Sequence, residues 1–224
     1  MRTAATTTIK APVSNSTKTT TNTISNTTST TTISALASCI SGLQEVAIPN
    51  GNFSTGTYAD WNITGYGFSS EPLNLTNANK NGGYYGAPWS NYGNNTFAAT
   101  TFQKGLAVQP GNLTSKPFLV TEPFLNFKIV SSQNNDIYVE ILHNGKPAIV
   151  AHYNTYAAPG NPNPQTTFEN ASIPLSTLLC QNVSIRVVFV ATGLSTTQYI
   201  AVTGFYLSKT PTYTPGIVVN QTLV

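Results

Sequence analysis

The chain has 224 residues, of which only 8% are charged, and its formal net charge is +3. Ordinary soluble domains hold roughly 25% charged residues, so the solubility of this chain must come from neutral polar groups or attached sugars. The few basic residues form no cluster, which argues against a nucleic-acid partner. No apolar run reaches the roughly 18 residues of a membrane span, so no membrane span is expected.

Residues 1–38 form a Thr/Ser-rich tail, with 20 Ser or Thr and no aromatic residue or acid. Such a stretch cannot bury a core of its own. All aromatic residues and the long apolar runs lie in residues 39–224. The sequence therefore predicts an extended tail followed by one folded head.

Within the tail, residues 7–13 show the period-2 pattern of a strand with one partly apolar face. That face holds Thr7, Ile9, Ala11 and Val13. A strand of this kind can add to an open sheet edge of a neighbouring copy of the chain, with residues 14–32 as the linker between subunits. The alternative is a glycosylated stalk that binds nothing.

The head reads as β-rich runs separated by Gly, Pro and Asn clusters, without a sustained 3.6-residue apolar period. The predicted strands cover residues 43–48, 61–68, 97–108, 118–130, 136–143, 147–153, 166–174, 183–191, 199–208 and 216–224. Residues 77–86 and 157–165 are rich in Gly, Asn or Pro and predict exposed loops. About ten strands at this spacing predict an all-β, jelly-roll-like antiparallel sandwich.

The head carries the motif IPNGNFSTG over residues 48–56, followed by Trp61. This motif resembles the opening of galactose-binding-like and carbohydrate-binding-module jelly rolls, in which the Phe and the Trp pack inside the sandwich. The later segments IYVEIL and YIAVTGFYLS look like the middle and closing strands of that fold. The resemblance implies that Phe53 and Trp61 are buried. Ser54 stands where those modules often have an acid, which puts their structural calcium in doubt for this chain.

Four aromatic residues gather in the Gly/Asn-rich stretch after the motif: Tyr84, Tyr85, Trp89 and Tyr92. Carbohydrate-binding modules use exposed aromatic rings as stacking platforms, with amide and hydroxyl partners. These four residues are the predicted sugar-binding residues if the chain acts as such a module. The alternative is that they pack over the edge of the sandwich.

The clearest local signal is the Asn-Gly pair at residues 144–145, which lies between two β-rich runs and predicts a type I′ hairpin. A two-residue loop places Val150 opposite Val139 and His152 opposite Ile137.

The sequence holds two cysteines, Cys39 and Cys180, with no CxxC spacing and no neighbouring His. This pattern argues against a zinc site and, in an exported protein, predicts a disulfide that joins the start of the head to a late strand. The alternative is a pair of buried free thiols.

Sequons of the form N-x-Ser/Thr are dense, and none has Pro in the middle. They lie at Asn15, Asn26, Asn52, Asn62, Asn74, Asn94, Asn112, Asn170, Asn182 and Asn220. Eight fall in the head, where chance would give about 4. The excess predicts N-linked glycans and export from the cell.

The sequence contains few residues that could form an active site. His143 and His152 lie at opposite ends of the predicted hairpin, too far apart to share a metal. The seven acids are scattered singly, without metal-binding or hydrolase spacing. We therefore expect no catalytic residue, no metal and no cofactor, apart from N-linked glycans.

Two functions remain open, and both place the protein outside the cell. The first is a structural subunit of a glycosylated surface filament or coat, which forms a homopolymer through its tail. The flexible leader and the low-charge, sequon-dense head are similar to archaeal thread-type and pilus subunits that assemble by donor-strand exchange. The alternative is a monomeric carbohydrate-binding module or adhesin that binds cell-surface or environmental glycans through the aromatic loop.

Overall fold

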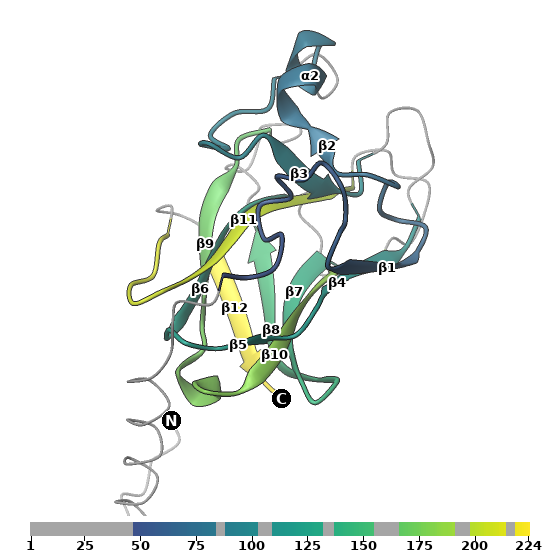
Figure 1. Cartoon of the computed structure of the whole chain (residues 1–224). Coiled ribbons are helices and arrows are strands. Elements are labelled where there is room, and N and C mark those ends of the chain that lie inside the picture. Colours follow the sequence, from purple (N-terminus) through teal and green to yellow (C-terminus); the bar gives the residue numbers. More distant parts are fainter. Residues whose placement is uncertain are drawn as a thin grey trace, which may run out of the picture.

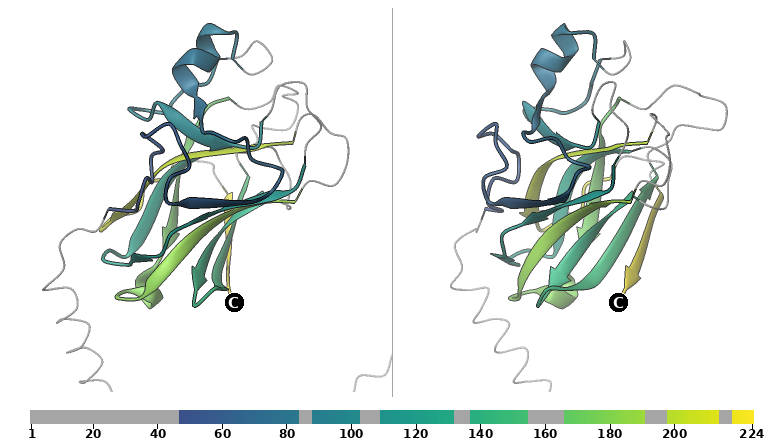
Figure 2. Two further views of the ribbon diagram at one scale, coloured as in Figure 1. Left: turned by 45° about the vertical axis from the view of Figure 1, so that its right-hand side comes forward. Right: turned by 90° about the vertical axis from the view of Figure 1, so that its right-hand side faces the viewer.

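The computed structural model describes residues 47–83, 88–102, 109–131, 137–154, 166–190, 198–213 and 218–224. In these residues two antiparallel β-sheets pack face to face, and Figure 2 shows them as separate layers. The all-β sandwich predicted from the sequence is therefore confirmed. The predicted donor segment 7–13, the linker 14–32 and the predicted start of the head lie outside the described residues.

Figure 1 labels the elements of both sheets. Among the described residues, the larger sheet runs in the order β1-β4-β10-β7-β8-β12, with β5 also paired to β10. Its strands are β1 (Trp61–Gly65), β4 (Gly111–Ser115), β5 (Phe118–Leu119), β7 (Ile137–His143), β8 (Lys146–Asn154), β10 (Asn182–Phe189) and β12 (Val218–Leu223).

The five-stranded sheet runs in the order β2-β3-β11-β6-β9. Its strands are β2 (Leu73–Asn74), β3 (Phe97–Thr100), β6 (Phe124–Ser131), β9 (Glu169–Pro174) and β11 (Ile200–Ser208). A short helix, α2 (Leu75–Lys80), follows β2, and a 3-10 turn, η1 (Ser176–Leu178), follows β9.

The core lies between the two sheets, where alternate side chains of each strand point inward. Leu125, Phe127 and Ile129 on β6 show this alternation and are each at most 1% exposed. Phe53 and Trp61 are 0% and 7% exposed, with ring centroids 5.2 Å apart, so their predicted burial is confirmed. Burial of side chains of this size contributes roughly 1.5–3 kcal/mol each.

The predicted turn at residues 144–145 joins β7 to β8, but the register predicted beyond it is wrong. The pairing shifts by one residue between Ile141 and Leu142, so β8 accommodates an additional residue next to Pro147. Pro147 has no N–H to donate to the ladder, which makes this a suitable place for a bulge. The partners of Val150 and His152 are therefore Glu140 and Tyr138.

The predicted strand 118–130 is divided into β5 and β6. The chain leaves the sheet between them at Pro123, whose carbonyl accepts a hydrogen bond from the Leu175 N–H at 2.7 Å. Proline cannot donate to a ladder, which explains the break. Residues 47 and 48, predicted to end a strand, lie in no strand.

Four elements were not predicted: the short β2 and η1, the strand β4 and the helix α2. The sequence of β4 is GNLTS, with one large apolar residue, and it forms a strand because β1 and β10 pair with it on both sides. Residues 77–80, predicted as a loop, belong to α2. The Asn74 side chain caps this helix by accepting a hydrogen bond from the Asn77 N–H at 2.9 Å, and Leu75 anchors it by burial.

Candidate functional site

The outer face of the five-stranded sheet carries two different surfaces. At one end, α2 and neighbouring residues cover the sheet with a second apolar cluster. Its buried members are Leu75, Trp89, Ala98, Val130, Phe168, Tyr199 and Ala201. At the other end lies a cleft with a volume of about 790 Å³, within the range of roughly 300–1,000 Å³ typical of small-ligand sites.

The 48–56 loop, which carries the motif, forms the first wall of this cleft. It attaches to β11, because the Phe205 N–H donates to the Gly51 carbonyl at 2.9 Å. A Cβ on Gly51 would lie 2.6 Å from the Phe205 carbonyl oxygen, so only glycine allows this approach. The loop is also held from the core side, where the buried Trp61 donates its Nε1–H to the Pro49 carbonyl at 3.1 Å.

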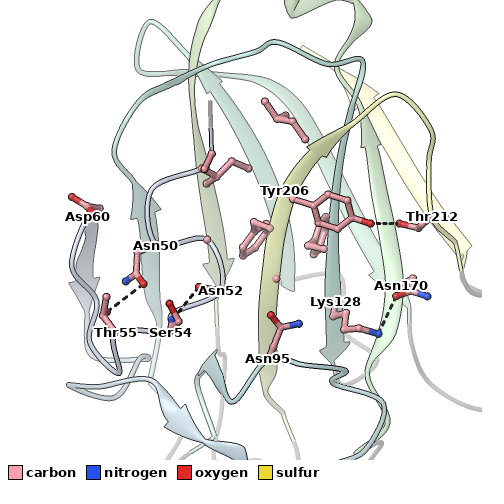
Figure 3. A pocket seen from close by; sticks show the side chains of 17 residues that line it. Asn50, Asn52, Ser54, Thr55, Asp60, Asn95, Lys128, Asn170, Tyr206 and Thr212 are labelled. Carbon is pink, nitrogen blue, oxygen red and sulfur yellow. Dashed lines mark hydrogen bonds between the residues drawn. The ribbon is translucent and has the colours of Figure 1, made fainter. Parts of the chain in front are cut away.

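Side-chain hydrogen bonds hold the same loop in one shape. Asn50 Nδ2 donates to the carbonyls of Thr57 and Ala59, both at 2.9 Å. Asn52 Oδ1 accepts from the Ser54 N–H at 3.1 Å. In Figure 3 Asn52 and Ser54 come from the loop on one side of the cleft, and Tyr206 comes from the strand facing them. The motif therefore builds a wall with polar side chains.

A β-bulge in β11 forms the opposite side of the cleft. The register of β11 against β6 shifts between Thr203 and Tyr206, and Gly204 at the shift has φ +67°. Glycine is the usual residue at this position of such a bulge. Phe205 stacks on Phe127 inside the core, with ring centroids 4.9 Å apart, and Tyr206 turns outward with 48% of its surface exposed.

Asn126, which is 0% exposed, fixes the segment that follows β11. Its Nδ2 donates to the Thr210 carbonyl at 2.9 Å, and its Oδ1 accepts from the Thr212 N–H at 3.2 Å and from Ser172 Oγ at 2.6 Å. The Thr212 hydroxyl lies 3.5 Å from the Tyr206 hydroxyl. This network holds Thr212 beside the Tyr206 ring at the rim of the cleft.

Lys128 and Asn170, from the paired strands β6 and β9, line the cleft next to Tyr206 (Figure 3). Lys128 Nζ donates to Asn170 Oδ1 at 3.1 Å. Partial burial lowers the pKa of Lys128, and the nearby Glu169 carboxylate opposes this shift. Asn95 also lines the cleft, and its Nδ2 donates to the Tyr92 carbonyl at 3.0 Å.

Asp60 is the one carboxylate among the described residues that line the cleft. It forms an ion pair with Lys116, with 2.7 Å between the two charged atoms. Most glycosidases need two carboxyl groups at the bond they cleave. The described residues also contain no group of three or more His, Cys, Asp or Glu that could hold a metal. The cleft lining thus presents amide, hydroxyl and ammonium groups to a polar ligand.

The structure places the predicted sugar-binding aromatics differently from the sequence expectation. Trp89 is 2% exposed and packs against Phe168, with ring centroids 5.7 Å apart. Tyr92 is half-buried against the same cluster, and Tyr84 and Tyr85 lie outside the described residues. The prediction of an open stacking face at Trp89 is wrong, because the sheet below it presents apolar side chains that need cover.

Tyr206 was missed as a site residue, although one signal for it exists in the sequence. An isolated glycine inside a strand pattern, here Gly204, indicates a bulge. A bulge reverses which of the following residues face outward, and it therefore exposes Tyr206 instead of Phe205.

The sequon asparagines with described side chains all reach the surface. Asn52, Asn62, Asn94 and Asn182 are exposed, and Asn74, Asn112 and Asn170 are half-buried. Asn220 lies on β12, and Asn15 and Asn26 lie outside the described residues. All seven side chains are thus accessible enough to carry the predicted glycans, which stay a prediction.

Cys180 is disulfide-bonded. The sequence has one other cysteine, Cys39, which lies outside the described residues, so the pairing of the two stays a prediction.

The two histidines are separated along the β7–β8 hairpin. His143 pairs with Lys146 at the turn, and His152 pairs with Tyr138 near the other end of β7.

Within the described ranges, no helix is long and apolar enough to cross a membrane.

No protein-family model and no curated protein matches the chain. Among solved structures, the C-terminal extracellular domain of Mycobacterium tuberculosis EmbC is 14% identical with a TM-score of 0.45, covering 80% of this chain and 71% of that one. The K1 cleaved adhesin domain of Porphyromonas gingivalis Lys-gingipain is 15% identical with a TM-score of 0.38, covering 66% and 89%.

The enzymatically active domain of bacteriophage CBA120 tailspike protein 4 is 12% identical with a TM-score of 0.39, and the match covers 70% of this chain but 20% of the tailspike chain. Likenesses of this strength do not bear on what this chain does.

Proposed function

We propose that this chain is a glycan-binding domain of an extracellular protein, and that the cleft beside the 48–56 loop is its binding site. The observation that carries the proposal is the Tyr206 ring, 48% exposed in a cleft lined by the amides of Asn52, Asn95 and Asn170. Sugar rings have one apolar C–H face and a periphery of hydroxyl groups. An aromatic ring can stack on the apolar face of the sugar, and the surrounding amides can form hydrogen bonds with its hydroxyl groups.

Three features support an extracellular location. Cys180 is disulfide-bonded, which is typical of oxidising compartments. The described sequon side chains outside the cleft are exposed or half-buried, as glycosylation requires; they are Asn62, Asn74, Asn94, Asn112 and Asn182. The low content of charged residues is also compatible with a surface covered by sugars.

Substitution of Tyr206 by Ala tests the proposal. The full chain is screened on a glycan array, and affinities for the glycans that bind are then measured by titration calorimetry. We expect Tyr206→Ala to lose tenfold or more in affinity, since it removes the stacking face, and Tyr206→Phe to retain most of it. Tyr66→Ala is the matched control, because Tyr66 is 82% exposed but does not line the cleft. Failure to bind any glycan, or equal binding by Tyr206→Ala, would refute the proposal.

A second candidate function, homopolymer assembly through the tail, is favoured by an open sheet edge. β9 ends the order of the five-stranded sheet, and within the described part of the chain it pairs only with β6. A strand formed by residues 7–13 of a neighbouring copy could add to such an edge and satisfy its backbone groups. The face with Thr7, Ile9, Ala11 and Val13 would then lie against the acceptor subunit, as in the archaeal filaments that the sequence resembles.

Deletion of residues 1–13 tests this second candidate. We expect the truncated chain to fold and to stay monomeric, whereas the full chain purified from its native source forms polymers visible by negative-stain microscopy. Ile9→Asp should weaken assembly without unfolding the head, because burial of Ile9 contributes roughly 1.5–3 kcal/mol to the contact. Filaments from the truncated chain, or a full chain that never polymerises, would contradict donor-strand assembly.

A further inference from the structure

Lys128 is the one cation among the described residues that line the cleft. Its stem passes close to Gly93, where a Cβ built on the glycine would be in van der Waals contact with Lys128 Cε, at 3.5 Å. Its ammonium donates to the neutral Asn170 amide at 3.1 Å. In Figure 3 the Lys128 side chain extends toward Asn170, within the part of the cleft that also holds Asn95 and Tyr206. The ammonium is therefore positioned where a ligand stacked on Tyr206 would meet it.

The charge of Lys128 lacks a direct counter-ion within the described part of the chain. The acid that shares the cleft lining, Asp60, is occupied by Lys116 at 2.7 Å. Glu169, on β9 next to Asn170, interacts with Lys128 electrostatically but does not line the cleft. Partial burial of an ammonium with a neutral hydrogen-bond partner is unfavourable, and it lowers the pKa of this lysine. An anionic ligand group would offset that cost.

We propose, building on the glycan-binding function, that the cleft selects sugars that carry a carboxylate and that the Lys128 ammonium binds this group. The three donors of an ammonium allow it to keep the Asn170 contact and still hold a carboxylate oxygen. The sugar ring then stacks on Tyr206, and the amides of Asn95 and Asn52 are left to meet its hydroxyl groups. Lys128 is thus a specificity-determining residue, whereas Tyr206 supports binding of neutral and acidic sugars alike.

The test compares carboxylate-bearing oligosaccharides with the same oligosaccharides after reduction of the carboxylate to a hydroxymethyl group. The full chain is produced in a host without N-glycosylation, so that Asn52 and Asn170, which line the cleft, carry no glycan. Binding is measured on an array of uronic-acid and sialic-acid oligosaccharides and their reduced counterparts, followed by calorimetry. We expect the acidic member of a pair to bind about tenfold to a hundredfold more tightly.

Variants at position 128 separate recognition of the carboxylate from binding in general. Lys128→Gln should weaken binding of the acidic member about tenfold or more and binding of the reduced counterpart much less, so that the preference disappears. Lys128→Arg should restore much of the preference. Lys80→Gln is the matched control, because it removes the same charge from the exposed end of α2.

Equal binding of both members, or an acidic preference that survives Lys128→Gln, overturns the inference. In either case the proposed function still stands if binding depends on Tyr206. The absence of any Tyr206-dependent binding overturns both.

Discussion

The apolar cluster and the cleft occupy two ends of the same outer sheet face, and the same two strands, β6 and β11, contribute to both. At the cluster end these strands present Val130 and Ala201, which are buried under α2 and the Trp89 ring. At the cleft end they present Lys128 and Tyr206, which line a space open to ligand. An aromatic residue in the sequence therefore gives no indication of exposure by itself. The neighbours that its strand or loop meets on the sheet decide whether it becomes core or binding surface.

The largest expected effect is at the cluster. Trp89→Ala should lower the free energy of unfolding by about 3–5 kcal/mol, since it empties a buried ring site that is 2% exposed. Tyr206→Ala, at the cleft, should stay within about 1 kcal/mol of the parent because about half of its surface, 48%, is already in water. Urea denaturation followed by circular dichroism measures both. Similar losses for the two variants would mean that Tyr206 contributes to stability as a core residue does.

An intermediate effect is expected at Asn126, which holds the cleft end together by hydrogen bonds instead of apolar packing. Asn126→Ala removes the bonds to Thr210, Thr212 and Ser172, each worth about 1 kcal/mol. We expect a loss of about 2–3 kcal/mol in stability, together with weaker glycan binding because Thr212 is no longer held beside Tyr206. If stability falls but affinity is unchanged, Asn126 supports the fold without shaping the cleft.

A smaller effect than at Trp89 or Asn126 is expected at the bulge itself. Gly204→Ala places a side chain at φ +67° and brings its Cβ within 2.7 Å of Asn95 Nδ2, so it should cost about 1–2 kcal/mol and displace Asn95. Gly145→Ala is a matched control, since Gly145 also has a positive φ, of +75°, but its Cβ would meet nothing within 4 Å. Thermal denaturation of both variants isolates the contact with Asn95. Equal destabilisation of the two variants would show that the contact with Asn95 adds nothing to the cost of Gly204→Ala.

Alternating apolar residues predicted most of the strands, and the Asn-Gly pair at residues 144–145 predicted the hairpin turn, because both depend on local pattern. The burial of Phe53 and Trp61 was implied by the resemblance of the 48–56 motif to galactose-binding-like jelly rolls. The features that form the cleft are not local. The contact between Gly51 and β11 and the pairing of Tyr206 with Asn126 on β6 each depend on a partner far away in the sequence. Trp89 packs over the sheet, in agreement with the alternative to sugar binding, and Tyr206 was not singled out, although the motif that forms one wall of the cleft was identified.

The bulge at Gly204 also has a consequence for how this site can change during evolution. Because side chains alternate along a strand, removal of one residue at the bulge would exchange the faces of everything after it in β11. Phe205 would then point to the solvent and Tyr206 into the core, where its hydroxyl group would lack water. A single-codon deletion would thus act as several simultaneous substitutions, whereas point mutations at position 206 can vary the ligand-facing side chain and leave the core intact. The number of residues in β11 is therefore expected to be under stronger selection than the identity of residue 206.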